Sequence, residues 1–338
     1  MFDIITFGSA TRDIFVRSEE LKIIESKEFL TGKALAVGAG EKVNVEELVF
    51  SVGGCGINTA VTFALQGLRV AYVGLIGHDL SGREIMRELN RLGVACDFVK
   101  FIQEQGTSAS IILSAPGKPV PRSLGGGGER SILVYKGASH LLSEENIPWE
   151  KMKESNWFYV AGLAGESAKT FASVVSFAKE NNIKLAVNPG RYQLNRDLEI
   201  FKTLLDRIDI LLVNQEEASK ITGIDFKKEE EIFKKFDELV PGIAVMTKGK
   251  EGVVVSDGKN IYRAGIPNSG YADRTGAGDA FGSGFVSGMI EKNDIEYAIQ
   301  LATANATSCV QQIGATNGLL KKGEWGEWGK VKVEKKQI

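Results

Sequence analysis

The sequence of 338 residues contains little cysteine and little histidine. Its three cysteines, Cys55, Cys96 and Cys309, are odd in number and form no C-x-x-C pair, which argues against a disulfide framework and a zinc site. The two histidines, His78 and His140, are far apart and lack metal-ligand spacing. A histidine-based triad would need one of them, and neither lies in a nucleophile motif, so we expect a different chemistry.

The sequence also lacks an excess of positive charge and a long apolar run. Lys and Arg number 41 against 43 Asp and Glu, a net charge of -2, so neither nucleic acid nor an anionic membrane is an expected partner. No stretch approaches the roughly 18 uninterrupted apolar residues of a membrane span. The start, MFDIITFGSATRD, shows no signal-peptide pattern. We therefore expect a soluble, cytoplasmic protein.

Apolar runs and helical patterns alternate along most of the chain, which is 43% apolar. Helical spacing is clear in 57–65 and in 81–93, where Ser81 is the expected N-cap and Gly93 the stop. The alternation predicts an α/β fold with a doubly wound, mainly parallel sheet flanked by helices, and ligands beyond the carboxyl ends of the strands. The expected strands are 3–8, 69–77, 157–162, 183–190, 209–217 and 242–249.

Two segments, 28–50 and 106–138, interrupt this rhythm with short β-like runs separated by glycine or proline. Three prolines lie between 116 and 121, and glycines fill 125–128, a composition typical of loop tips. We interpret the two segments as a small β-sheet outgrowth of one domain, 1–320, serving as a lid or an oligomer surface. Residues 321–338 are expected to form a solvated C-terminal extension.

The stretch DRTGAGDAF, residues 273–281, carries the strongest chemical signal. Gly276, Ala277 and Gly278 leave a bare backbone before an apparent helix, and the N-terminus of a helix attracts anions. Asp279 directly behind this turn can accept a proton from an attacking alcohol, the arrangement that phosphoryl transfer needs. The alternative is an ordinary glycine turn followed by an acidic residue in the first turn of a helix.

Two features near the N-terminus suggest where a substrate binds. Gly53, Gly54 and Gly56 precede a helix in SVGGCGINTA and either cradle a ligand or form a tight strand–helix turn. The spacing does not fit a P-loop, because no G-K-[ST] follows. Asp13 follows the first strand, at the carboxyl edge of the predicted sheet, and is otherwise a solvated loop residue.

Two later segments suggest a nucleotide site. Asn214 and Glu217, in NQEE, are i, i+3 neighbours at the end of a strand. They suit a water-coordinated Mg²⁺ or a phosphate–Mg²⁺ complex, or they are a capping residue and a first-turn acid. The sequence TKGKEGV, residues 247–253, is a glycine-punctuated hairpin that either contacts a nucleotide or only turns the chain.

Taken in order, these segments resemble the ribokinase-like (PfkB) carbohydrate kinases. The matching blocks are G-S-x-x-x-D (8–13), G-G-x-G-x-N (53–58), G-x-I-G-x-D-x-x-G (74–82), N-x-x-E (214–217), T-x-G-x-x-G (247–252) and D-x-T-G-A-G-D-A-F (273–281). The resemblance covers residues 2–316. It implies a doubly wound domain with a β lid, and transfer of the γ-phosphate of ATP to a hydroxyl, usually a primary CH₂OH.

The resemblance also implies a role for each matching residue. Asp279 is the expected general base, with the backbone of Gly276, Ala277 and Gly278 as the anion hole. The remaining expected sites are substrate binding by Asp13, Gly53, Gly54 and Asn58; ATP binding by Asn214, Glu217, Thr247, Gly249, Gly252 and Asn305; Mg²⁺ held through water by Glu217; and, as in some members, K⁺ at Asp273 and Thr275.

The substrate stays open at the level of the sequence. Thr11 stands where ribose-specific members have Asn, and a sugar phosphate would call for a cation such as Arg130, so we include Arg130 among the substrate-binding residues. Arg274 departs from the usual Thr of the motif and has no assigned role. A nucleoside kinase is the main alternative to a sugar kinase, and a non-catalytic sugar-binding protein is a further one. The resemblance also implies a homodimer formed through the lid.

Overall fold

The computed structural model describes residues 1–29, 31–115 and 130–338. Residue 30 and residues 116–129 lie outside the described part of the chain. Parts of both predicted lid segments are therefore not described, including the proline cluster at 116–121 and the glycine run at 125–128.

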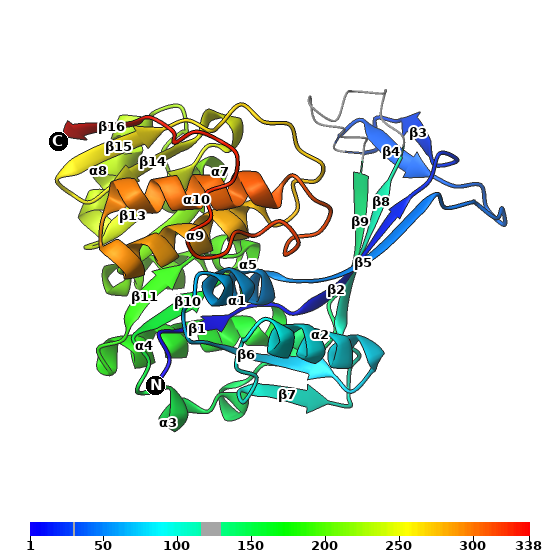
Figure 1. The fold of residues 1–338 in the computed structure, drawn as a ribbon, viewed down its shortest axis with the longest axis horizontal. Coiled ribbons are helices and arrows are strands. Elements are labelled where there is room, and N and C mark those ends of the chain that lie inside the picture. Colours follow the sequence, from blue (N-terminus) through cyan, green and yellow to red (C-terminus); the bar gives the residue numbers. More distant parts are fainter. Residues whose placement is uncertain (30, 116–129) are drawn as a thin grey trace.

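A large, mainly parallel sheet forms the centre of the molecule (Figure 1). Its strand order is β16-β15-β14-β13-β12-β11-β10-β1-β6-β7, parallel from β7 to β13 and antiparallel from β13 to β16. The strands are β1 Ile4–Phe7, β6 Val70–Gly77, β7 Val99–Ile102, β10 Trp157–Val160, β11 Lys184–Val187, β12 Ile210–Asn214, β13 Ile243–Thr247, β14 Val253–Ser256, β15 Asn260–Ala264 and β16 Val333–Gln337. The predicted doubly wound α/β class is confirmed.

Helices cover both faces of this sheet, which explains why most of its parallel strands are largely apolar. The helices are α1 Cys55–Leu65, α2 Leu80–Arg91, α3 Trp149–Met152, α4 Phe171–Glu180, α5 Arg191–Asn195, α6 Leu198–Lys202, α7 Gln215–Thr222, α8 Glu229–Leu239, α9 Ala277–Lys292 and α10 Ile295–Cys309. Neighbouring residues of β1 enter different cores: Ile4 belongs to the core that includes residues of α1, α2, α9 and α10, whereas Ile5 belongs to the core that includes residues of α4, α7 and α8. This alternation follows from the period of two along a strand.

A smaller sheet projects from the large domain as the lid (Figure 1). Its order is β5-β2-β8-β9, and a separate two-stranded ribbon of β3 and β4 accompanies it. These strands are β2 Thr11–Arg17, β3 Lys22–Glu25, β4 Lys33–Ala36, β5 Glu47–Gly53, β8 Ser108–Ser114 and β9 Arg130–Tyr135. The predicted lid segments did not include β2, which pairs with both β5 and β8.

Two other details differ from the sequence-based expectations. Helix α2 begins at Leu80, and its N-cap is Asp79, which accepts a hydrogen bond from the Gly82 amide at 2.8 Å, so the prediction of Ser81 as the cap is wrong. Within the C-terminal extension, Val333–Gln337 form β16 on the edge of the large sheet. No helix among the described residues is long and apolar enough to span a membrane.

Candidate active site

Two helix N-termini meet near the carboxyl edge of the large sheet. Helix α1 carries Asn58 and helix α9 carries Asp279, and the Asn58 Nδ2 donates to Asp279 Oδ2 at 2.8 Å. These residues are 221 positions apart in the sequence. The fold therefore joins the two glycine-rich segments that the sequence analysis treated separately.

The turn before α9 depends on glycine at position 276. Gly276 has a φ of 81°, and a Cβ there would lie 2.4 Å from the Ala315 Cβ, so a side chain is excluded by both conformation and space. The Ala280 amide donates to Gly276 O at 2.8 Å, and the amides before it have no acceptor within the helix. That of Ala277 makes only a 3.3 Å contact with the Arg274 carbonyl, while the space in front of Gly278 is open. The turn can therefore receive an anion.

Asp279 lies in the first turn of α9 with an unusual protonation equilibrium. Burial raises its pKa from 3.8 to about 6; the hydrogen bond from Asn58 opposes this shift, and the nearby Asp13 charge adds to it. A carboxylate with this pKa is largely ionised at neutral pH and still binds a proton better than an ordinary aspartate. It is suited to act as a general base.

The lid supplies the opposite side of the site. Asp13 is 4% exposed and lies in β2, where its Oδ1 accepts from Thr11 Oγ1 at 2.9 Å. Its pKa is raised by burial, and hydrogen bonds from Thr11 and Ser110 limit the shift. The sequence analysis expected Asp13 at the edge of the large sheet, and the structure instead assigns it to the lid sheet.

The glycines of the 53–56 turn are fixed by close packing. A Cβ on Gly53 would lie 2.0 Å from Asp13 Oδ2, and one on Gly54, whose φ is 94°, would lie 2.5 Å from the Ser9 carbonyl oxygen. The Asn58 Oδ1 is buried without a partner among the described residues. Asp13, Asn58 and Asp279 thus lie close together, because Asn58 donates to Asp279 and the charge of Asp13 raises the pKa of Asp279.

The expected nucleotide residues of β12 and β13 lie side by side. Asn214 and Thr247 are register partners at the carboxyl ends of these parallel strands. Asn214 and Glu217 form a capping box, with Glu217 N donating to Asn214 Oδ1 at 3.0 Å and Asn214 N donating to Glu217 Oε2 at 2.9 Å. Burial raises the pKa of Glu217. The contacts of this pair are therefore those of the capping alternative.

The hairpin between β13 and β14 contains glycines of two kinds. Gly252 has a φ of 94°, and a Cβ there would lie 1.9 Å from the Ala264 carbonyl oxygen, so this glycine is required by the fold. Gly249 also has a positive φ, 57°, but a Cβ at this position would have no atom within 4 Å. The backbone at Gly249 is therefore open to a neighbouring molecule.

Asn305, predicted to lie near the nucleotide, has its side-chain amide engaged within the fold. It is fully buried, its Nδ2 donates to the Ala280 carbonyl at 2.9 Å, and its Oδ1 accepts from the Leu320 amide at 2.9 Å. On the opposite face of α10, Gln300, Thr303 and Ala304 line a small cavity. Thr303 is 3% exposed, and its Oγ1 has no partner among the described residues. Gln300, Thr303 and Ala304 have i, i+3, i+4 spacing, and this spacing is the sequence signal that places them on one face of the helix.

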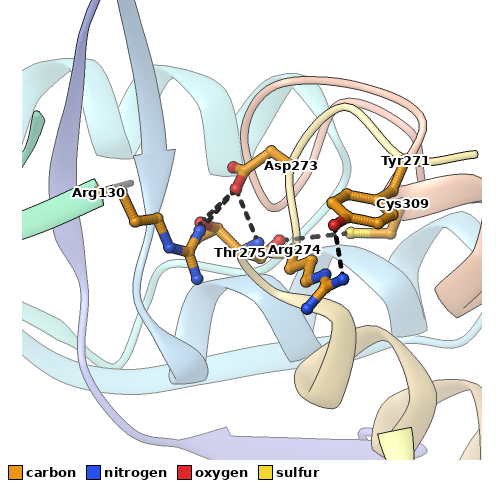
Figure 2. A network of polar contacts seen from close by, with 6 residues as sticks. All are labelled: Arg130, Tyr271, Asp273, Arg274, Thr275 and Cys309. Atoms are coloured by element: carbon orange, nitrogen blue, oxygen red, sulfur yellow. Dashed lines mark hydrogen bonds and ion pairs between the residues drawn. The ribbon is translucent and has the colours of Figure 1, made fainter. Parts of the chain in front are cut away.

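Two arginines lie at the 273–279 turn: Arg130 reaches it from the lid, and Arg274 is part of the turn itself (Figure 2). Arg130 Nη1, from β9 of the lid, lies 2.8 Å from Asp273 Oδ1 and 3.1 Å from Thr275 Oγ1. The Asp273 Oδ2 is buried without a partner among the described residues. The Arg274 guanidinium lies 4.1 Å from the centre of the Tyr271 ring and donates to its hydroxyl at 2.6 Å. Arg274 thus packs on its own loop.

The doubly wound sheet, the β lid and the glycine turn at the start of α9 together define the ribokinase-like class of fold. Comparison with known proteins agrees with this class of fold. The sequence profile described as pfkB family carbohydrate kinase matches residues 1–322, which narrows the class to one family. The chain belongs to the pfkB family of carbohydrate kinases, and it is a kinase enzyme with ATP as the family's phosphate donor.

Individual relatives are similar over almost their whole length. A ribokinase of Lactococcus lactis is 28% identical over 302 residues, 88% of this chain and 92% of the relative. The structure of an Arabidopsis thaliana ribokinase complexed with ribose and ATP has a TM-score of 0.73 at 24% identity and covers 95% of this chain and 96% of its own. An adenosine kinase from Sinorhizobium meliloti has a TM-score of 0.73 at 23% identity, covering 93% and 95%. The likeness to these two structures concerns the fold.

Proposed function

We propose that this enzyme transfers the γ-phosphate of ATP to a hydroxyl of a sugar, a primary CH₂OH in the arrangement that the family resemblance implies. The observation that carries the proposal is Asp279, with a pKa of about 6, beside the glycine turn that opens α9. Asp279 takes the proton of the attacking hydroxyl as the new O–P bond forms, while the bond between the γ-phosphorus and the β,γ-bridging oxygen breaks and ADP leaves. The backbone of Gly276, Ala277 and Gly278 receives the negative charge of the transferring group.

The substrate hydroxyls bind between the lid and α1. Asp13 accepts from one or two of them, and the unpartnered Asn58 Oδ1 accepts from another. Asn58 also keeps Asp279 in place through the 2.8 Å hydrogen bond. Gly53 and Gly54 bring bare backbone close to the sugar.

The donor lies along the ends of β12 and β13. Asn214, Thr247, Gly249 and Gly252 line it, since Asn214 and Thr247 are adjacent and Gly249 is open. An open cavity of about 540 Å³ between 265–268 and 327–332 is a fitting place for the nucleoside. This cavity adjoins the hairpin, because Gly265, one of its lining residues, lies against Gly252.

Two cations fit the residues that surround the donor. Among the described residues no group of three His, Cys, Asp or Glu side chains could hold a metal, which fits a Mg²⁺ held mainly by phosphate and water, with Glu217 reached through water. Such a Mg²⁺ would neutralise the charge of the triphosphate. The buried Asp273 Oδ2, which lacks a partner among the described residues, together with Thr275, fits a monovalent cation such as K⁺.

A second copy of the chain fits the outer face of the lid. Leu48, Phe50 and Leu133 are 54%, 52% and 55% exposed. Strand register aligns Phe50, Ile14, Ile111 and Leu133 in one row across the four strands, on the face opposite Asp13. We propose a homodimer through this face. Light scattering of the wild type and of Leu48→Lys should give a dimer and a monomer, and a monomeric wild type would exclude it.

A substrate panel with Mg-ATP tests the proposed function. Ribose, other sugars, sugar phosphates, adenosine and uridine are each supplied, and ADP formation is followed with the purified protein. Turnover with a sugar as the best substrate is the expected result. Preference for adenosine or uridine would replace the proposed sugar kinase with a nucleoside kinase. The similarity of the fold to that of an adenosine kinase is the reason for including these nucleosides. Sugar binding by calorimetry without ADP from any compound would indicate a non-catalytic protein.

A further inference from the structure

We propose that Arg130 is a positioning residue that couples the lid to the phosphate-binding turn through Asp273. This inference rests on the proposed function, because it assigns the turn 273–278 to the transferred phosphoryl group. It differs from the expectation that Arg130 binds substrate directly, since the partners of its guanidinium are residues of the turn itself (Figure 2).

The position of Arg130 in the lid directs it toward the active site. Arg130 is the first residue of β9, and Val134, four residues later on the same face, is in register with Ser110 and through it with Asp13. Arg130 and Asp13 therefore lie on the same face of the lid sheet. From this face Arg130 contacts Asp273, which lies 143 positions later in the sequence.

Asp273 transmits the contact to the turn. Its Oδ1 accepts from the Thr275 amide at 3.1 Å, from Thr275 Oγ1 at 2.9 Å and from Arg130 Nη1 at 2.8 Å. Thr275 directly precedes Gly276, whose left-handed conformation begins the anion hole. Because one carboxylate oxygen binds both the lid and the turn, closing the lid and shaping the anion hole become one event.

Charge gives the contact a second consequence. Asp13, Asp273 and Asp279 lie close enough that the charge of Asp273 raises the pKa of Asp13, and that of Asp13 raises the pKa of Asp279. Three carboxylates around an anion hole would repel a triphosphate. With the lid closed, the Arg130 guanidinium supplies a compensating positive charge beside this cluster.

The decisive variants are Arg130→Gln, Arg130→Lys, Asp273→Asn and the double variant, with Arg17→Gln as control. Arg17 is a lid arginine in the same cross-strand row, since both it and Arg130 are in register with Ser114, yet its side chain has no hydrogen bond or ion pair with any described residue. Arg130→Gln should lower kcat on the order of tenfold and change the KM of the sugar less than about threefold. Arg130→Lys should recover most of this loss, and Arg17→Gln should behave as wild type.

The double variant distinguishes coupling from direct substrate binding. If Arg130 acts through Asp273, Arg130→Gln has no further effect once position 273 is Asn, whatever else Asp273→Asn removes. If the effects of the two single substitutions on kcat multiply in the double variant, the inference is overturned in favour of direct binding. The same holds if Arg130→Gln raises only the KM of an anionic substrate.

Hydrogen exchange of the protein without substrate separates this inference from the proposed function. Arg130→Gln should speed exchange in peptides from both β9 and 271–279, and Arg17→Gln in neither. Faster exchange in β9 alone would refute the coupling. Failure of every compound in the substrate panel would refute the kinase proposal, while the exchange result would still decide whether the lid is linked to the turn.

Discussion

Replacing Asp279 by Asn should stabilise the folded protein at neutral pH. The folded-state pKa of Asp279 is about 6 against an ordinary value of 3.8. A difference of about two pKa units corresponds to about 3 kcal/mol, and because Asp279 is only half-buried by surface exposure we expect about 2 kcal/mol. Asn resembles the protonated acid in shape and can still accept the hydrogen bond from Asn58, so the variant avoids burying a charge.

The pH dependence of this gain follows from the sign of the shift. A raised pKa means that the folded protein binds the proton more tightly than the unfolded chain, so the penalty is present above pH about 6 and absent below pH about 4. Denaturant titrations of wild type and Asp279→Asn should therefore differ by about 2 kcal/mol near pH 8 and converge toward pH 4. Asp206→Asn, at an exposed carboxylate, is the matched control and should stay within about 0.5 kcal/mol. Equal stabilities of wild type and Asp279→Asn at every pH would refute the argument that burial sets this pKa.

Three further predictions concern the same site. In the wild type, kcat/KM should fall about tenfold per pH unit below pH about 6, as Asp279 becomes protonated, and a flat profile down to pH 5 would contradict this. Asn58→Ala removes the hydrogen bond that lowers the pKa of Asp279, so the acid limb of that profile should move to higher pH; an unmoved limb would count against the role of Asn58. Gly276→Ala should lose about 1–3 kcal/mol of stability because of its φ of 81° and the 2.4 Å approach to Ala315, whereas Gly278→Ala, at an open position, should melt like wild type but turn over slowly. Thermal melts beside initial rates check this pair, and equal melting of both variants would be the opposing result.

The fold was predictable because its signals are local. Most parallel strands bury both faces and so appear as largely apolar runs, and Gly284 and Gly288 mark where α9 packs closely on α10. The edge strand β7 was not predicted, because its two central residues, Lys100 and Phe101, are exposed. β2 was missed because Asp13 and two arginines occupy it, and its burial comes from pairing with β5 and β8, which no local pattern encodes. Asp79 was missed as a cap because Ser81, two residues later, is also a favourable capping residue; the contact of Asp79 with the Thr107 amide is a long-range one that the sequence does not show.

The candidate site was partly predictable for similar reasons. Glycines that a positive φ or a close approach requires, such as Gly276 and Gly252, are recognisable in motifs because no other residue fits. The ion pair between Arg130 and Asp273 depends on how the lid closes over the turn, and the sequence holds no sign of it. The contacts of Asn305 with Ala280 and Leu320 were not predictable, because its place on a helix does not reveal which residues pack against that face.

The turnover of Asp279→Asn with the best substrate of the panel tests the central claim most directly. The variant should fold, bind nucleotide with an affinity within about threefold of wild type, and transfer phosphate about 10²–10⁴ times more slowly. A folded Asp279→Asn protein that phosphorylates the same substrate at the wild-type rate would contradict the assignment of Asp279 as the base.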